Sequence, residues 1–262
     1  MHPALPKVSI RFYAELNDHL PEPKKYRSLD KALITPTTAK DLIESFGVPH
    51  TEVDLVLLNG SSVGFEQFVE PGDRVSVYPV FEAFDITTEL RVRPEPLRET
   101  RFVLDVHLGK LAAYLRMLGF DARYQSCFSD EDLARISAEE RRILLTRDRE
   151  LLKRGQVTHG YWLRQTDSRR QTAEILNRFD LASAIQPFMR CMACNGLLED
   201  IAKDQVRERI PPLAAEVHDE FRQCRGCGRV YWKGSHYRRM VTWIQQLISE
   251  SGFDQSVPLR RD

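Results

Sequence analysis

Three aspartates stand at the borders of predicted strands and helices, where their side chains could share a cation. Asp105 follows a short apolar run, Asp148 comes shortly after a second apolar run, and Asp130 opens a predicted helix. In an open α/β sheet, functional groups gather beyond the carboxyl ends of the strands, so two of these acids lie where a site is expected and the third can face them. Carboxylates held together repel one another, and the oxygen-ligated ions that suit such a cluster are Mg²⁺ and Mn²⁺. Such ions support in-line displacement at phosphorus, so we expect phosphoryl chemistry here.

Each acid also has a structural interpretation, and the sequence alone leaves these interpretations open. Asp130 can simply occupy the first turn of a helix, where the helix dipole favours a negative charge. Asp148 can cap the helix after it. Asp105 is harder to explain in this way, because an acid that ends a buried strand costs free energy without a partner. Further acidic candidates in the same region are Glu131 and Asp132 in place of Asp130, and Asp167 as a fourth acid.

Four of the five cysteines form two Cys-x-x-Cys pairs, Cys191 with Cys194 and Cys224 with Cys227. Two such pairs supply four thiolates, which is the donor set of a tetrahedral structural Zn²⁺ site without an open coordination position. Redox-active dithiols or disulfides are the alternative. The remaining Cys127 is an odd thiol, which favours a reducing compartment.

Cations near both motifs could bind the phosphates of a nucleic acid. Lys110 and Arg147 flank the acids in the sequence, with solvated ion pairs as the alternative. The second cysteine pair lies in a stretch, residues 222–239, that contains several cations and no acid. Aromatic rings interleave with these cations, a composition that suits single-stranded or splayed RNA, although the same rings could fill the small core of a zinc ribbon. The cations singled out in this stretch are Arg225, Arg229 and Lys233.

The composition indicates a globular protein with more than one domain. The chain has 262 residues, of which 42% are hydrophobic, and this excludes wholesale disorder. No apolar run approaches the roughly 18–20 residues that cross a bilayer, and no signal-peptide core follows Met1, so we expect a cytoplasmic protein without a membrane segment. Residues 1–90 hold 8 Lys and Arg against 14 Asp and Glu, whereas residues 91–262 hold 30 against 24. The second part is therefore the candidate for phosphate binding.

The pattern of elements predicts an α/β chain in four segments. Residues 1–86 show a strand, a helix and two further strands, with the turn dipeptide Asn59-Gly60 after the first of those two, which indicates a β-grasp domain. Residues 87–100 are rich in proline and charge and indicate a linker. Residues 101–186 alternate strands with helices and predict a parallel sheet. Residues 187–262 carry the cysteine pairs and are expected to form a zinc ribbon with a C-terminal helix.

The first segment resembles the ubiquitin-like domain of small sulfur carriers. The matching phrases are R-F-Y-A-E-L near the start and P-G-D-R-V-S-V-Y-P near the end. Those carriers react through a free C-terminal Gly-Gly, whereas this chain continues into V-F-E-A-F-D without one. We therefore expect a docking or folding module with a protein partner, and a sulfur-transfer accessory role is disfavoured.

The acid-bearing segment and the cysteine pairs together resemble the Mut-seven C-terminal ribonuclease family, whose nuclease domain is PIN-like. The resemblance rests on F-V-L-D-V-H-L-G-K-L-A-A-Y-L-R-M-L-G-F-D, then D-E-D-L-A, then R-I-L-L-T-R-D-R-E-L-L, followed by the zinc ribbon. It implies a metal-dependent ribonuclease in which Asp105, Asp130 and Asp148 match the acidic positions of the family. The implied reaction is in-line hydrolysis of an RNA phosphodiester, with tRNA or another structured RNA as a candidate substrate. A non-catalytic RNA-binding adaptor with a structural zinc ribbon is the alternative from another class.

Overall fold

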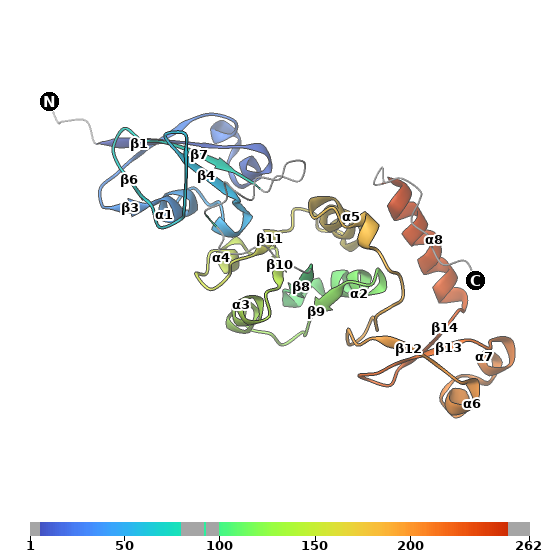
Figure 1. Ribbon diagram of the computed structural model, residues 1–262. Coiled ribbons are helices and arrows are strands. Elements are labelled where there is room, and N and C mark those ends of the chain that lie inside the picture. Colours follow the sequence, from blue (N-terminus) through green and yellow to red (C-terminus); the bar gives the residue numbers. More distant parts are fainter. Residues whose placement is uncertain (1–5, 80–91, 93–99, 251–262) are drawn as a thin grey trace. The chain divides into compact units, whose positions relative to one another are not determined.

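The computed structural model describes residues 6–79, 92 and 100–250 (Figure 1). By its internal contacts the chain divides into two compact units. In the described part of the chain, no helix combines the length and the apolar character that crossing a lipid bilayer requires.

The first unit, residues 1–99 with residues 129–162, begins with a five-stranded mixed sheet of order β2-β1-β7-β4-β5. Strand β1 pairs in parallel with β7 and antiparallel with β2, while β4 pairs antiparallel with both β7 and β5. The bounds of these strands are Lys7–Phe12 for β1, Leu29–Ala32 for β2, Leu55–Leu58 for β4, Ser61–Val63 for β5 and Arg74–Tyr78 for β7. A separate antiparallel pair joins β3 (Thr37–Thr38) to β6 (Phe68–Val69).

One α-helix accompanies this sheet, and its start follows from the local sequence. The hydroxyl of Thr38 accepts the backbone N–H of Asp41 and so caps α1 (Ala39–Glu44). Asn59 and Gly60 both have positive φ, as the predicted turn between β4 and β5 requires. The arrangement is the β-grasp, ubiquitin-like fold that the sequence predicts. Short 3-10 helices complete it at Ala14–His19, Glu22–Lys24 and His50–Glu52.

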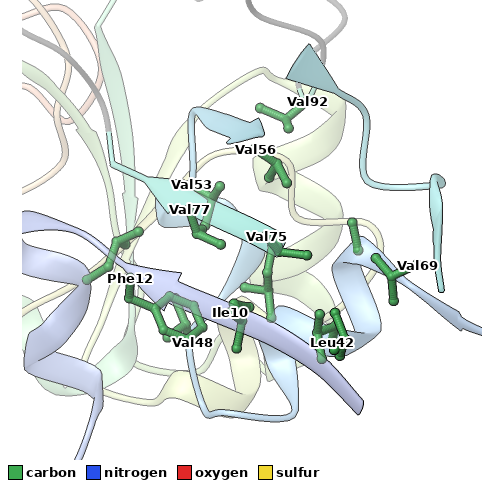
Figure 2. Close-up of a cluster of buried hydrophobic side chains, with 14 of the residues drawn as sticks. Ile10, Phe12, Leu42, Val48, Val53, Val56, Val69, Val75, Val77 and Val92 are labelled. Atoms are coloured by element: carbon green, nitrogen blue, oxygen red, sulfur yellow. The ribbon is translucent and has the colours of Figure 1, made fainter. Parts of the chain in front are cut away.

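The core of this domain is made by side chains that alternate along the strands. Val8, Ile10 and Phe12 point to the buried face of β1, because successive residues of a strand face opposite sides. Figure 2 shows Ile10 and Phe12 within the hydrophobic cluster that also contains Leu42 of α1. Val92, one residue of the predicted linker, packs in the same cluster. Residues 87–91 and 93–99 of that predicted linker lie outside the described residues.

The rest of the first unit consists of α3 (Asp130–Glu139), β10 (Ile143–Thr146), α4 (Arg149–Leu152) and β11 (Gly160–Trp162). Strands β10 and β11 pair in parallel. The predicted helix opened by Asp130 starts with a capping box: the Ser129 hydroxyl accepts the N–H of Asp132, and the Asp132 carboxylate accepts the N–H of Ser129.

The second unit, residues 100–128 with residues 163–262, begins with β8 (Arg101–Leu104), which pairs in parallel with β9 (Asp121–Arg123). A 3-10 helix (Val106–Leu108) leads into α2 (Gly109–Met117), and Gly119, with φ of +100°, ends that helix. A side chain at Gly119 would collide with the backbone of Gln186, so this position requires glycine for space as well as for φ. Helix α5 spans Ser168–Arg178, and a 3-10 helix follows at Ala182–Ala184.

The cysteine-bearing end of the second unit is a three-stranded antiparallel sheet, in the order β12-β13-β14. These strands span Leu198–Ile201, Phe221–Cys224 and Val230–Trp232. Short helices lie between β12 and β13: α6 at Lys203–Val206, a 3-10 helix at Arg207–Arg209 and α7 at Pro212–Val217. The chain then forms the long helix α8 (Ser235–Glu250).

Candidate metal centre, catalytic acids and phosphate-binding cations

The four cysteines of the two Cys-x-x-Cys pairs meet at one place in the second unit. Their sulfur atoms all lie within 4.8 Å of one another. The Sγ atoms of Cys191 and Cys227 are 3.6 Å apart, and those of Cys194 and Cys224 are 3.3 Å apart. Both distances exceed the roughly 2.05 Å of a disulfide bond. They are close to the edge of about 3.8 Å that follows from tetrahedral geometry with Zn–S bonds of about 2.3 Å. The donor set therefore fits Zn²⁺.

The surroundings of the thiols also suit thiolate ligands. The backbone N–H groups of Gly226 and Cys227 point at the sulfur of Cys224, at 3.3 and 3.5 Å. Burial raises the pKa of the Cys191 thiol, but hydrogen bonds from the Tyr231 hydroxyl and from backbone N–H groups outweigh it and lower that pKa to about 6. Burial and the neighbouring thiols raise the pKa of Cys194 to about 12. Neighbouring thiols thus resist carrying negative charges side by side, and a bound divalent cation offsets that repulsion.

The turn between the first two cysteines is fastened to the strand and helix at the start of the second unit. The Asn195 side chain donates to Asp121 at 2.8 Å and accepts the backbone N–H of Ala122 at 3.1 Å. The guanidinium of Arg116, only 3% exposed, donates to the backbone carbonyls of Met192 and Ala193, which lie inside the first cysteine pair, and to that of Ala122. Burial lowers the pKa of Arg116, while the nearby Cys194 and Cys191 act in the opposite direction. The guanidinium of Arg116 thus joins the first cysteine pair to β9 through hydrogen bonds to both.

Arg116→Met is expected to loosen the metal centre although Arg116 is not a ligand. The change removes a charged donor from three backbone carbonyls, of which that of Ala122 is buried, and should lower the free energy of unfolding by about 3 kcal/mol. Transfer of zinc to a colorimetric chelator should become roughly tenfold faster, the factor that about 1.4 kcal/mol of this loss produces. Arg135→Met, which removes an exposed arginine from α3, is the matched control. Equal zinc-transfer rates in both variants would contradict the coupling.

Asp105 directly follows β8 and is the residue that caps the 3-10 helix Val106–Leu108. Its Oδ1 atom accepts the backbone N–H of His107 at 3.3 Å. The carboxylate is half-buried, which agrees with its position at the end of a strand whose last three residues are buried.

Asp148 caps α4 two residues after β10. Its Oδ1 atom accepts the N–H of Glu150 at 2.8 Å, and its own N–H donates to the Thr146 hydroxyl at 2.9 Å. Asp130 is the first residue of α3, where it forms a long ion pair of 3.7 Å with Arg154. Both aspartates are exposed. Asp130 therefore lies in the first turn of a helix and Asp148 caps a helix, as their structural interpretations predict. The cap of Asp148 uses only one of its two carboxylate oxygens.

Asp167, the predicted fourth candidate, follows the same pattern at the start of α5. Its Oδ1 atom accepts the N–H groups of Arg169 and Arg170, at 3.0 and 3.1 Å. The bond from Arg170 is the largest cause of a lowered pKa of Asp167, and the positive charge of Lys110 contributes to it. Lys110, the second residue of α2, therefore lies near Asp167 within the second unit.

The predicted phosphate-binding cations are exposed, and two of the five form ion pairs that the sequence does not reveal. Arg225 forms a 2.6 Å ion pair with Glu199 of β12, and Lys233 forms a 2.7 Å ion pair with Glu220. Arg229 has no acid within ion-pair distance among the described residues. Arg147 offers its backbone carbonyl to the indole N–H of Trp162, which leaves its own side chain exposed.

The sequence analysis does not identify two residues that support the metal centre, Arg116 and Asn195. Arg116 is a cation in an otherwise apolar stretch of α2, and that contrast is the signal that could have identified it. Asn195 directly follows Cys194 and has φ of +74°, a conformation that asparagine tolerates better than most residues. The contacts that join these two residues across the second unit, Arg116 to Ala193 and Asn195 to Asp121, span more than 70 positions, so the spacing of motifs could not predict them.

Comparison with known proteins finds two matching family models. The Mut7-C RNAse domain matches residues 100–244, and the Mut7-C ubiquitin domain matches residues 5–85. No curated protein matches the chain. Among solved structures, SAMP1 from Haloferax volcanii is similar at 14% identity, over 30% of this chain and 99% of SAMP1, with a TM-score of 0.24.

Proposed function

Because the chain belongs to the Mut7-C RNAse domain family, we propose that it is a metal-dependent ribonuclease that hydrolyses RNA phosphodiester bonds. The observation that carries the proposal is the extent of the family match, since residues 100–244 contain the three acids, the four cysteines and the candidate cations. The site consists of Asp105, Asp130 and Asp148, with Asp167 as a fourth acid. We place the protein in the cytoplasm, where four thiols stay reduced for zinc.

The acids are suited to hold Mg²⁺ or Mn²⁺ at the carboxyl ends of strands. Asp105 directly follows β8, and Asp148 lies two residues after the end of β10. Such an ion, when bound, supplies a Lewis acid for the phosphate and a lowered pKa for water. The chain orients the carboxylate of Asp148, because the N–H of Glu150 holds one of its oxygens. The position of the second oxygen is thereby fixed as well.

The cations are suited to hold the RNA backbone. Lys110 lies beside Asp167, close enough to influence its pKa, and offers an ammonium group to a phosphate near the acids. On the ribbon, the exposed Arg229 can bind a phosphate directly. Arg225 and Lys233 must first release the exposed carboxylates of their ion pairs. Exposed ion pairs of this kind contribute about 0–1 kcal/mol, so the exchange costs little. tRNA is a candidate substrate, and the ubiquitin-like domain is a candidate site for a protein partner.

A non-catalytic RNA-binding adaptor is the second candidate, and the capping bonds of the acids favour it. Asp105, Asp148 and Asp167 each satisfy backbone N–H groups at the start of a helix, which is a sufficient structural reason for an acid at each position. The two proposals differ in whether a cation is needed for a chemical step.

Labelled small RNA incubated with the purified chain should be cleaved with Mg²⁺ or Mn²⁺ and stay intact with EDTA. Adding back excess Zn²⁺ and Mg²⁺ together should restore cleavage, whereas Zn²⁺ alone should not, which separates the acidic site from the zinc centre. A chain that binds RNA and retains zinc, yet leaves the RNA intact under every metal condition, would support the adaptor.

A further inference from the structure

Glu52, in the ubiquitin-like part of the first unit, is a carboxylate buried to 1% exposure. Its Oε1 atom accepts the backbone N–H of Trp162 at 2.5 Å, and its Oε2 atom lies 2.9 Å from the Nε2 atom of His19. The side chain of His19 is also buried. A buried carboxylate costs several kcal/mol unless it is paired and hydrogen-bonded, so this arrangement is a built contact between two distant parts of the sequence.

The two residues before Glu52 face the same segment. The Nε2 atom of His50 lies 2.9 Å from the carbonyl oxygen of Val157, while its Nδ1 atom lies 2.6 Å from Glu44. Thr51 approaches Gly160: a Cβ atom at Gly160 would meet the Thr51 hydroxyl at 3.4 Å and the Leu152 side chain at 2.5 Å. The 3-10 helix His50–Glu52 therefore lies against residues 157–162 over its full length.

The segment that Glu52 holds is the edge of the sheet. Among the described residues, β11 pairs with one strand of its unit, β10. An edge strand presents backbone N–H groups without a strand partner. The Glu52 carboxylate accepts one of them, the N–H of Trp162, and so supplies an acceptor that a neighbouring strand would otherwise provide.

Trp162 links this contact to the turn that carries Asp148. Its indole N–H donates to the carbonyl of Arg147 at 3.1 Å, and the guanidinium of Arg149 lies 5.0 Å from its ring centroid. Arg149 also donates to the carbonyl of His19 at 3.2 Å. Both sequence neighbours of Asp148 are thus held by Trp162, and one of them is held by the ubiquitin-like part as well.

We propose that Glu52 is a positioning residue: it fixes β11 through Trp162 and thereby holds the Arg147–Arg149 turn in the geometry that directs Asp148. The ubiquitin-like part is then an internal support of the nuclease and not only a docking module. The effect on turnover rests on the proposed ribonuclease activity, whereas the effect on the turn itself does not.

Hydrogen–deuterium exchange of the full-length chain tests the support directly. In Glu52→Ala, amides in residues 147–162 should exchange at least about tenfold faster, because Trp162 loses its acceptor and the turn loses its anchor. Glu52→Gln keeps an oxygen that can accept the Trp162 N–H and should restore part of the protection. Glu66→Ala, at an exposed position of the same domain, is the control. Unchanged protection of β1 and β7 shows that the domain remains folded.

Turnover is the second measurement. In the Glu52→Ala chain, kcat on labelled RNA should fall roughly tenfold while KM stays within about twofold, since the RNA-binding cations are untouched. Unchanged exchange in residues 147–162 would overturn the proposal whether or not the chain cleaves RNA. Faster exchange with unchanged kcat would also overturn it, because Glu52 would then be structural only. A wild-type chain that does not cleave RNA would refute the proposed function, and the exchange result would still decide whether Glu52 supports the turn.

Discussion

Asp148→Asn is expected to reduce metal-dependent RNA cleavage roughly a thousandfold, or about 4 kcal/mol of transition-state stabilisation. The change removes the negative charge that a divalent cation requires. Asparagine keeps the size of the side chain and an oxygen that can accept the N–H of Glu150, so the cap of α4 is retained. Asparagine and aspartate are similarly good at capping, and we expect the free energy of unfolding to change by less than about 0.5 kcal/mol. Loss of activity without loss of stability is the distinctive outcome.

The measurement is cleavage of labelled RNA in Mg²⁺, beside thermal unfolding and RNA binding of the same preparation. Asp132→Asn is the matched control, because Asp132 is an acid in the first turn of α3 next to Asp130, with its charge used in the capping box and an ion pair with Arg135. The control should cleave RNA at close to the wild-type rate. Wild-type cleavage by the Asp148→Asn chain would leave the carboxylate with its capping role alone and would remove it from the catalytic site.

Cys224→Ser is expected to abolish stable zinc binding and to unfold the ribbon. Cys224 is 1% exposed, receives N–H bonds from Gly226 and Cys227, and ends β13. The core beside it is small, with Leu198 as a buried apolar neighbour, so the sheet cannot rely on hydrophobic burial. Structural zinc contributes about 10–16 kcal/mol in isolated zinc fingers, far more than such a core supplies. The loss should therefore exceed that of any other single change considered.

Zinc content and amide exchange across residues 198–232 measure this effect. Cys127→Ser is the control, because Cys127 is an exposed thiol outside the cluster, and it should leave zinc content and exchange unchanged. Retained protection of β12, β13 and β14 after complete removal of zinc would show that the ribbon folds without metal.

Local signals made most of the fold predictable. The apolar run before Asp148 forms strand β10, and Asp130 opens a helix as expected, because an apolar run and a helix start depend on residues that are close in the sequence. Helix α8 is longer than its apolar pattern indicates and begins at Ser235, since its polar first turns have no apolar period. Ring contacts of Tyr237 with Phe188 and of Trp243 with Tyr114 hold it instead.

The candidate site was predictable only where it depends on the sequence nearby. The spacing of the four cysteines predicts that they form one cluster, and the structure confirms that they meet. The capping roles of Asp148 and Asp130's place at the start of α3 follow from neighbouring residues. The ion pair of Arg225 with Glu199 does not, because β12 brings that acid from 26 positions away. The assembly of the three acids stays a prediction of the same non-local kind.

The contact between Asn195 and β9 has a consequence for biosynthesis. The two partners, Asn195 and Asp121, are 74 positions apart. At about 5–20 residues per second, a ribosome delivers Asn195 roughly 4–15 seconds after Asp121. Until then the backbone N–H of Ala122, on the outer strand of its sheet, has no asparagine to bind. A nascent chain therefore presents an unprotected strand edge for seconds, during which that edge can pair with another chain and aggregate.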